Sequence, residues 1–442
     1  MSEPLIAVEL TRWADPASVF VGMHADDPHA FWLDAGPDAP TGWSWVGTGS
    51  PETDPAAVRA VVCAGEADGR DEEAGRFHGG WVGWLGYDAA AARAGAPSSR
   101  SEDAMPSEQW LRVERFVAFD HTARRAWAIA SPPVAGALAR AVDALPHAPI
   151  PPPAAATAAT AHARHSAAQY AELIERCRAA IREGDAYQLC LTTRFAVEAS
   201  VDALEAYRRL REATPAHHGG FLRAGDVSLA SASPERFLEV GRGIVRTRPI
   251  KGTRPRGADA VSDAALAEEL RTDVKERAEN VMIVDLMRND LSRVCEAGTV
   301  GVDGLLEVES YPAVHQLVST VSGTLAPSTT VGELLDAAFP AGSMTGAPKL
   351  SAMTILHDLE RRPRGVFAGC FGWVGADGAL DLAMVIRSVV VHPGGAYVGA
   401  GGGITWRSDA AAEVAEVATK ARAPLAALGA VLPGAWGSDI LN

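Results

Sequence analysis

The segment 366–406 restricts the possible fold of this chain more than any other segment does. It alternates short apolar runs with an Asp-Gly turn at 377–378 and a Pro-Gly-Gly turn at 393–395. Turns this short join antiparallel strands, whereas parallel strands need a long crossover connection. Helical periodicity occurs in separate blocks, at 166–184, 266–290 and 410–428. Because strands and helices do not alternate, the pattern predicts an α+β fold with antiparallel sheets.

The Pro/Ala-rich stretch 146–168 divides the chain of 442 residues. Before it, residues 1–145 are mostly strand-like, with a hairpin loop predicted at Asp120 to Thr122. After it, residues 169–430 hold the three helical blocks. We interpret 146–168 as a linker or surface crossing, and we expect both flanking segments to form one composite fold.

The net charge of −15 bears on possible partners. It argues against nucleic acid and anionic membranes, which both require a basic field. The N-terminus lacks the features of a secretory signal, and no apolar run approaches the length of a membrane span. We therefore expect a cytoplasmic protein in which any anionic ligand is held by a local site.

Two E-x-x-E steps lie on two different predicted helices. They are Glu276 with Glu279, and Glu413 with Glu416. Residues three apart share a helix face, so two facing helices of this kind could hold one Mg²⁺ through carboxylate oxygens. Glutamates on a solvated helix face have the same spacing, and that alternative stays open here.

Two further motifs could bind or attack an anionic substrate. The glycine run at 400–404 could direct backbone N–H groups at an anion, or could be a bulge or tight turn. Lys251 lies between Ile250 and Gly252 in a basic segment. A lysine in this setting can act as a nucleophile, although an exposed basic turn has the same composition.

Taken together, these motifs resemble those of the chorismate-utilising enzymes, which include anthranilate, aminodeoxychorismate, isochorismate and salicylate synthases. The matching segments are 184–195, 231–237, 248–257, 275–295, 339–353, 381–388 and 399–404. The resemblance is dense from about residue 165 to 428. It implies an anthranilate synthase component I-like fold, in which two antiparallel sheets with surrounding helices pack around a deep cleft that binds chorismate and Mg²⁺.

The resemblance also assigns roles to individual residues. It implies that Glu279 and Glu416 bind Mg²⁺ and that Glu276 and Glu413 support it through water. The residues implied to bind chorismate are Arg387 and Lys420 toward its carboxylates, Gly402 and Gly403 as backbone donors, Ser343 and Thr345 lining the pocket, and Gly252 and Thr253 beside Lys251.

Within the family, the form P-I-K-G-T at 249–253 resembles aminodeoxychorismate synthase component I. In that reading Lys251 forms a covalent intermediate with chorismate and Glu235 protonates the leaving hydroxyl, so that ammonia gives 4-amino-4-deoxychorismate for 4-aminobenzoate and folate. Gln188 stands where isochorismate and salicylate synthases have a water-activating lysine, which disfavours hydroxylation. The alternatives are anthranilate synthase component I and a non-catalytic paralogue that binds chorismate or tryptophan.

Several positions depart from the anthranilate synthases. Phe367 replaces a tyrosine, Gln316 replaces a histidine, and Ala35 stands in place of a serine tied to tryptophan feedback. His315, one residue before Gln316, is interpreted as structural. The glutaminase pattern G-x-C-x-G followed by H-x-E has its nearest match at Cys370 and is incomplete there. We expect a separate glutaminase subunit, component II, to supply ammonia.

Overall fold

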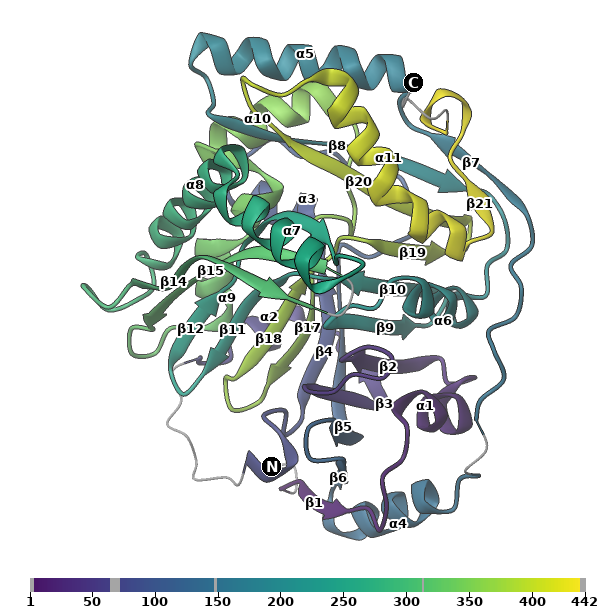
Figure 1. The fold of residues 1–442 in the computed structure, drawn as a ribbon. Helices are drawn as coiled ribbons and strands as arrows, with labels where there is room; N and C mark the ends of the chain where they lie inside the picture. Colours follow the sequence, from purple (N-terminus) through teal and green to yellow (C-terminus); the bar gives the residue numbers. More distant parts are fainter. Residues whose placement is uncertain (1–3, 64–71, 147–148, 312–313, 438–442) are drawn as a thin grey trace.

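The computed structural model describes residues 4–63, 72–146, 149–311 and 314–437 (Figure 1). The predicted segments 1–145, 146–168 and 169–430 therefore each include a few residues outside these ranges. Helices and strands are mixed, and a large antiparallel-rich sheet dominates, as predicted for an α+β fold. None of the described helices has the length and apolar character needed to cross a membrane.

The long strand β5 (Glu108–Asp120) is the centre of the sheet. Its C-terminal half pairs with β6 (Arg125–Ala130), which in turn pairs with β1 (Ile6–Glu9). The carboxylate of Asp120 accepts hydrogen bonds from the N–H groups of Thr122 and Ala123 at 2.8 and 3.1 Å. This local bond closes the turn between β5 and β6, which confirms the predicted hairpin.

Two branches of antiparallel strands extend from β5. The first runs in the order β3 (Trp43–Pro51), β2 (His29–Asp34), β9 (His218–Ala224), β10 (Val227–Ser233), β19 (Ser388–His392), β20 (Gly395–Ile404) and β8 (Gln188–Val197), and ends at β7 (Ala159–Ala163) and β16 (Gly346–Ala347). The second runs in the order β4 (Gly80–Leu85), β17 (Cys370–Gly375), β18 (Leu380–Met384), β11 (Arg236–Gly241), β12 (Ile244–Thr247) and β15 (Val314–Thr324), and ends at β13 (Ile250–Pro255) and β14 (Gly301–Ser310). The pairings β2–β9 and β4–β17 join strands from before and after the Pro/Ala-rich stretch.

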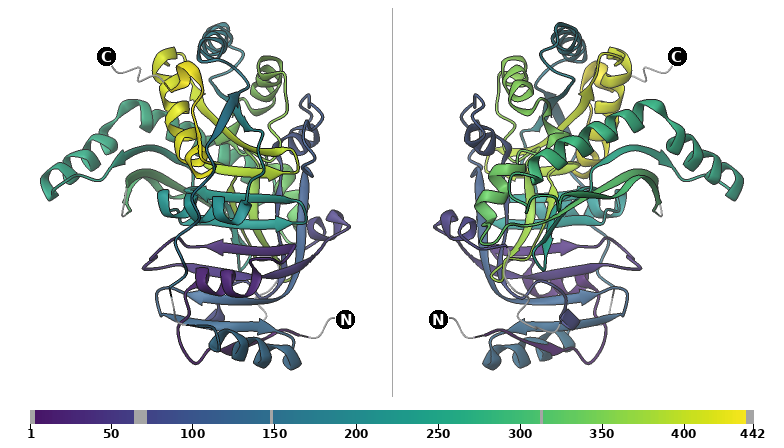
Figure 2. Two further views of the ribbon diagram at one scale, coloured as in Figure 1. Left: turned by 90° about the vertical axis from the view of Figure 1, so that its right-hand side faces the viewer. Right: turned by 90° about the vertical axis from the view of Figure 1, so that its left-hand side faces the viewer.

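Side chains of the first branch face two different cores. On β2, Phe31 and Leu33 belong to the core shared with the second branch, whereas Ala30 and Trp32 belong to a core shared with helices. The alternation follows from the two-residue period of a strand. Helices of the second core are α1 (Pro16–His24), α4 (Pro132–Asp143), α5 (Ala167–Glu183), α6 (Ala203–Ala213), α10 (Lys349–Glu360) and α11 (Ala410–Ala427). Figure 2 shows α4 at the end of the molecule opposite α5, α10 and α11.

Helix α5 begins and ends as predicted. Ser166 and Gln169 form a capping box at its start, and Gly184 ends it in the left-handed conformation at φ 89°. Both signals act through local backbone groups, so they do not depend on tertiary contacts.

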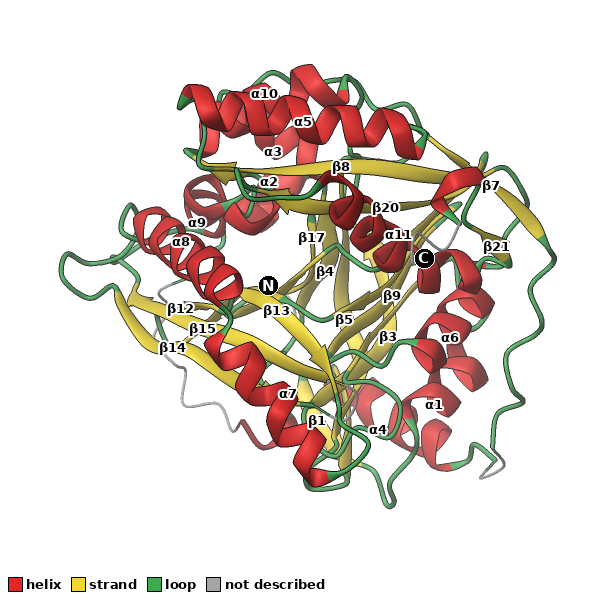
Figure 3. Ribbon diagram, turned by 45° about the horizontal axis from the view of Figure 1, so that its top comes forward, coloured by secondary structure: helices red, strands yellow, loops and turns green. Residues whose placement is uncertain are grey.

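The predicted single helix over 266–290 is wrong. The structure has two helices, α7 (Ala260–Thr272) and α8 (Val274–Leu291), which are separate elements in Figure 3. Asp273 lies between them in an extended conformation, and its side chain accepts a hydrogen bond from the Glu276 N–H at 3.0 Å. This N-cap starts a new helix and fixes the direction of the residues that follow.

The predicted linker at 146–168 is partly regular. Within it, β7 pairs with β8 and also, in parallel, with β21 (Ala430–Val431). The remaining helices, α2 (Pro55–Arg59), α3 (Tyr87–Arg93) and α9 (Val331–Ala338), pack on the core shared by the two branches.

Candidate active site

Lys251 lies on a strand that is interrupted by a bulge. The register of β13 against β15 shifts between Ile250 and Thr253, and Gly252 has φ +80°. A Cβ atom at Gly252 would lie 2.7 Å from Leu270 Cδ1 and 3.0 Å from Glu276, so both the conformation and the packing require glycine. A bulge of this kind re-aims a neighbouring side chain.

The Lys251 ammonium points into the molecule rather than into solvent. Its Nζ lies 3.9 Å from Glu279 Oε2, and a Cβ atom on Gly403 would lie 3.6 Å from the same nitrogen. Lys251 thus lies between α8 and β20, and the alternative of an exposed basic turn is wrong. Thr253, in contrast, is exposed and lies opposite Gln316 in the β13–β15 ladder.

Glu235 is a buried acid near Lys251. It precedes β11, is 8% exposed, and burial raises the pKa of its carboxyl from 4.5 to about 7. The Lys251 charge and a hydrogen bond from Ser343 partly oppose this rise in pKa. Near neutral pH the group therefore exists in both protonated and ionised forms, as an acid catalyst requires.

Four predicted metal ligands lie near the N-termini of α8 and α11. Lys275 on α8 lies 3.5 Å from Glu413 Oε1 on α11, so the two helices approach each other here. Ser408 donates a hydrogen bond to Glu413 Oε1 at 2.7 Å. The pKa values of Glu276 and Glu279 are raised, chiefly by burial, whereas burial and Lys420 act in opposite directions on Glu416 and leave its pKa lowered.

The donor set of these glutamates fits a hard divalent cation. Carboxylate oxygens are the ligands that Mg²⁺ prefers, and the buried Glu279 Oε1 has no hydrogen-bond partner. Within the described ranges, no three acidic, histidine or cysteine side chains converge tightly enough to form a complete metal cage. An arrangement of few protein ligands suits Mg²⁺, because this cation usually retains several water molecules as ligands.

Two basic side chains are placed to hold anions. Arg387 has the left-handed φ of +51°, which is costly for a residue with a side chain. Its guanidinium makes no hydrogen bond or ion pair with any residue that the structure describes, and burial lowers its pKa. Lys420 lies 2.6 Å from Glu416 Oε1 and donates a hydrogen bond to the Gly401 carbonyl at 3.0 Å.

The glycine run is the end of strand β20 (Gly395–Ile404), so the alternative of a tight turn is wrong. Gly401, Gly402 and Gly403 pair with Thr192, Leu191 and Cys190 of β8. The N–H groups of Cys190 and Thr192 are bonded away from β20, to Thr345 and Glu360. Because hydrogen bonding alternates along an antiparallel ladder, Gly401 and Gly403 direct their N–H groups away from β8, and Gly402 directs its own toward it. The prediction of Gly402 as a backbone donor to a ligand is therefore wrong, because its N–H is used within the sheet.

The two predicted residues of the segment 343–345 differ in position. Ser343 hydrogen-bonds Glu235 and so belongs to the site. Thr345 is fully buried, and its hydroxyl donates to the Ala341 carbonyl at 3.1 Å. Its side chain therefore closes the local 3-10 turn.

Two polar side chains outside the predicted ligand set also lie here. Gln188 is fully buried, neither of its amide atoms has a partner, and its Nε2 lies 2.6 Å from a Cβ position on Gly403. Lys275 contacts both acidic helices. The sequence signal for Lys275 was its position directly before the first E-x-x-E step.

Two of the departures noted in the sequence have structural roles. Phe367 packs on β20, where a Cβ atom at Gly399 would clash with its ring at 2.1 Å. His315 is buried and bonded to Ser310 at 2.8 Å and to Asp263 at 3.0 Å. These contacts confirm the structural interpretation of His315.

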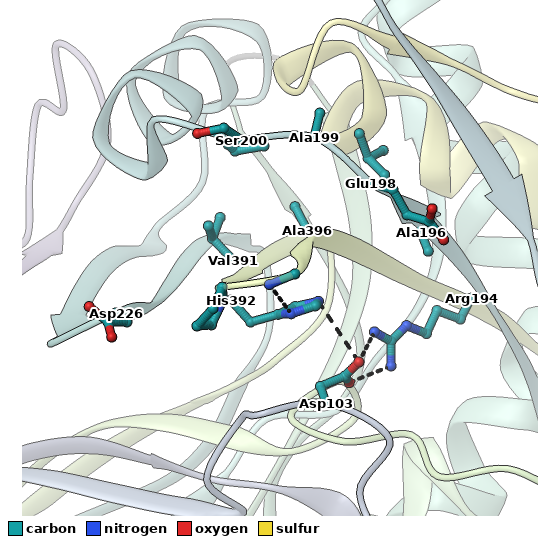
Figure 4. A pocket seen from close by; sticks show the side chains of 14 residues that line it. Asp103, Arg194, Ala196, Glu198, Ala199, Ser200, Asp226, Val391, His392 and Ala396 are labelled. Atoms are coloured by element: carbon teal, nitrogen blue, oxygen red, sulfur yellow. Dashed lines mark hydrogen bonds and ion pairs between the residues drawn. The ribbon is translucent and has the colours of Figure 1, made fainter.

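Two cavities lie apart from Lys251. One, of about 780 Å³, is formed at the β19–β20 turn and the end of β8, where Asp103 pairs with Arg194 and His392 (Figure 4). None of the predicted site residues lines it. A second cavity, of about 470 Å³, is lined by Ala35 and reaches Ile250, the neighbour of Lys251.

Comparison with known proteins defines the class of the site. Residues 44–426 match the family model described as chorismate binding enzyme. The chain belongs to the chorismate binding enzyme family.

Individual relatives agree with this assignment. The chain is 39% identical to an aminodeoxychorismate synthase of Streptomyces pristinaespiralis over 96% of its own length and 65% of that relative. It thus spans slightly less than two thirds of that protein. It is 42% identical to anthranilate synthase component 1 of Streptomyces coelicolor over 80% of its length and 73% of the relative. The crystal structure of anthranilate synthase component I from Streptococcus pneumoniae matches with a TM-score of 0.73 and 29% identity, covering 95% of this chain and 92% of that one.

Proposed function

We propose that this chain acts as aminodeoxychorismate synthase component I, which converts chorismate and ammonia to 4-amino-4-deoxychorismate for 4-aminobenzoate and folate. The observation that carries the proposal is the position of Lys251, which the bulge in β13 turns toward Glu279 and Gly403. Glu235 supplies an acid beside it, with a pKa of about 7. A nucleophile and an acid together suit a substitution in which a hydroxyl leaves.

The proposed reaction has two displacements. Lys251 first loses its ammonium proton to solvent. The neutral amine then forms a bond to ring C2, the ring double bonds shift, and the C4–O bond breaks. Glu235 gives its proton to the departing hydroxyl, which leaves as water. Ammonia then forms a bond to C4, the double bonds shift back, and the C2–N bond to Lys251 breaks. Two displacements place nitrogen at C4 on the face that the hydroxyl occupied.

Binding of chorismate requires compensation of its two carboxylates, because an unpaired buried carboxylate is costly. Arg387 and Lys420 supply positive charge, and the N–H groups of Gly401 and Gly403 supply donors. Glu279 and Glu416 would hold Mg²⁺, with Glu276 and Glu413 acting through water. When bound, Mg²⁺ supplies positive charge for a substrate carboxylate.

A glutaminase partner, component II, would supply the ammonia. Cys370, the nearest match to a glutaminase nucleophile, is buried in β17, and burial strongly raises the pKa of its thiol. A thiol in this state is a poor nucleophile. This observation supports a separate source of ammonia.

Anthranilate synthase component I is the second candidate, since the Streptomyces coelicolor relative of that name is 42% identical. Lys251 separates the two reactions. Purified protein, chorismate and Mg²⁺ without ammonia should give a protein adduct with the mass of chorismate minus water, seen by intact-protein mass spectrometry.

The variants Lys251→Ala and Lys251→Arg should show no adduct, and Lys251→Arg keeps the positive charge as a matched control for binding. Full ammonia-dependent activity in Lys251→Ala would overturn the covalent mechanism.

A further inference from the structure

Lys275, near the start of α8, bridges the two acidic helices. Its Nζ lies 3.5 Å from Glu413 Oε1 on α11 and 3.9 Å from Glu279 Oε1 on its own helix. Of the cations that the structure describes here, Lys275 is the one that forms ion pairs with glutamates of both helices. Its ammonium therefore lies between the groups proposed to bind the metal.

The other basic groups near these glutamates serve one helix each. Lys251 faces Glu279 and Arg254 faces Glu276, both on α8. Lys420 pairs with Glu416 on its own helix α11. Removing Lys251, Arg254 or Lys420 would therefore not remove the positive charge that bridges α8 and α11.

Lysine is rare in this chain, which makes its use at this position informative. Of the 40 basic residues, four are lysines: Lys251, Lys275, Lys349 and Lys420. Arginine supplies the other positive charges, including those of the exposed ion pairs. Lysine presents a compact point charge, whereas arginine presents a broad planar fork. The Lys275 ammonium is thus a compact positive charge between carboxylates, similar in charge distribution to a small metal cation.

We propose that Lys275 is an internal substitute for the divalent cation, whose ammonium compensates the glutamates in the metal-free protein and moves away when the metal binds. The inference rests on the proposed metal site. Two like charges a few ångströms apart repel each other strongly in a partly buried site. The Lys275 side chain is 47% exposed, so it has space to move toward solvent. Lys275 is therefore a positioning residue that stabilises the empty site and weakens metal binding.

Titration of Mg²⁺ into protein without chorismate tests this inference. Lys275→Met keeps the length of the side chain and removes its charge. By isothermal calorimetry, its dissociation constant for Mg²⁺ should fall about tenfold relative to wild type, the size expected for loss of one partly buried like charge. The midpoint of thermal unfolding without metal should fall, and the gain in midpoint on adding Mg²⁺ should rise.

The matched control is Arg288→Met, which removes a half-exposed positive charge near the other end of α8. It should leave the Mg²⁺ dissociation constant unchanged. An unchanged or weaker affinity in Lys275→Met overturns the inference while leaving the metal site intact. Absence of Mg²⁺ binding to the wild-type protein overturns the proposed metal site, and this inference with it.

A measurement on unmutated protein decides the case if Lys275→Met does not fold. Protein labelled with ¹³C at lysine Cε contains only four labelled side chains. Mg²⁺ should shift the Lys275 signal, assigned with Lys275→Arg, toward the position of an exposed lysine. The signal of Lys349, which is bound to Asp290 at 2.6 Å, should not move. A Lys275 signal that stays in place at saturating Mg²⁺ overturns the inference.

Discussion

Replacing Glu235 by glutamine should make the protein more stable and much less active. The Glu235 carboxyl is 8% exposed, and burial raises its pKa from 4.5 to about 7. The folded protein therefore binds this proton more tightly than the unfolded chain does. The resulting stabilisation is full below pH 4.5, decreases as the pH rises, and is lost above about pH 7.

The size of the effect follows from the shift in pKa. A rise from 4.5 to about 7 corresponds to about 3 kcal/mol between the two protonation states. Glutamine stays neutral at every pH, so Glu235→Gln should raise the free energy of unfolding by up to about 3 kcal/mol at pH 8, relative to its effect at pH 4.5.

Activity should respond in the opposite direction. A general acid works when protonated. The fraction of the protein with a protonated Glu235 falls about tenfold per pH unit above pH 7, which gives wild-type kcat/KM a descending limb at alkaline pH. Glu235→Gln should lose about 10²- to 10⁴-fold in kcat/KM and should lack this descending limb. Ser343→Ala removes a hydrogen bond that lowers the pKa of Glu235. The descending limb of the pH profile of this variant should therefore move to higher pH.

The assay couples product formation to an aminodeoxychorismate lyase and measures 4-aminobenzoate across pH 5.5 to 9, and urea unfolding gives the stabilities. Glu114→Gln, at a half-exposed position on β5, controls for loss of a carboxylate. Wild-type activity in Glu235→Gln above pH 7, or a lower stability of this variant at pH 8 than at pH 4.5 relative to wild type, would refute the reasoning.

Three other perturbations test separate parts of the structure. Gly252→Ala should cost about 2 to 4 kcal/mol in urea unfolding, because it adds a clash with Leu270 to an unfavourable φ, whereas Gly225→Ala, at φ +63° with open space around it, should cost about 1 kcal/mol. Arg387→Ala should raise the KM for chorismate about 10- to 100-fold in initial-rate assays, since a charge-assisted contact is lost; an unchanged KM would remove Arg387 from the substrate site. Lys349→Met should lower the free energy of unfolding by about 3 kcal/mol at pH 8 by leaving Asp290 unpaired, and by less at pH 5, because burial raises the pKa of Asp290 to about 6.

Local signals in the sequence were sufficient to predict helix ends where a single residue determines the backbone conformation. Ser166 and Gly184 bound α5 because capping and the left-handed conformation depend on neighbouring atoms. The same reasoning failed at Asp273, where an amphipathic pattern continues through a residue that ends one helix and begins the next. Periodicity records which side chains are apolar, and it is insensitive to a single extended residue.

In the site, too, some features follow from local sequence and others depend on tertiary contacts. The sequence identified Lys251 and Glu235 as candidate catalytic residues. Their burial and mutual position, however, depend on the pairing of β13 with β15 and on the contact with α8. The alternation of N–H directions at Gly401 to Gly403 depends on a ladder with β8, more than 200 residues away in sequence. Lys275 could not be placed because its partner Glu413 comes from another helix.

Product identity is the most direct test of the proposed function. Purified protein is incubated with chorismate, Mg²⁺ and ammonium, and the mixture is divided between direct fluorescence and treatment with an aminodeoxychorismate lyase. The proposal predicts 4-aminobenzoate after the lyase and no anthranilate fluorescence before it. Anthranilate fluorescence without the lyase, and no 4-aminobenzoate with it, would contradict the proposal.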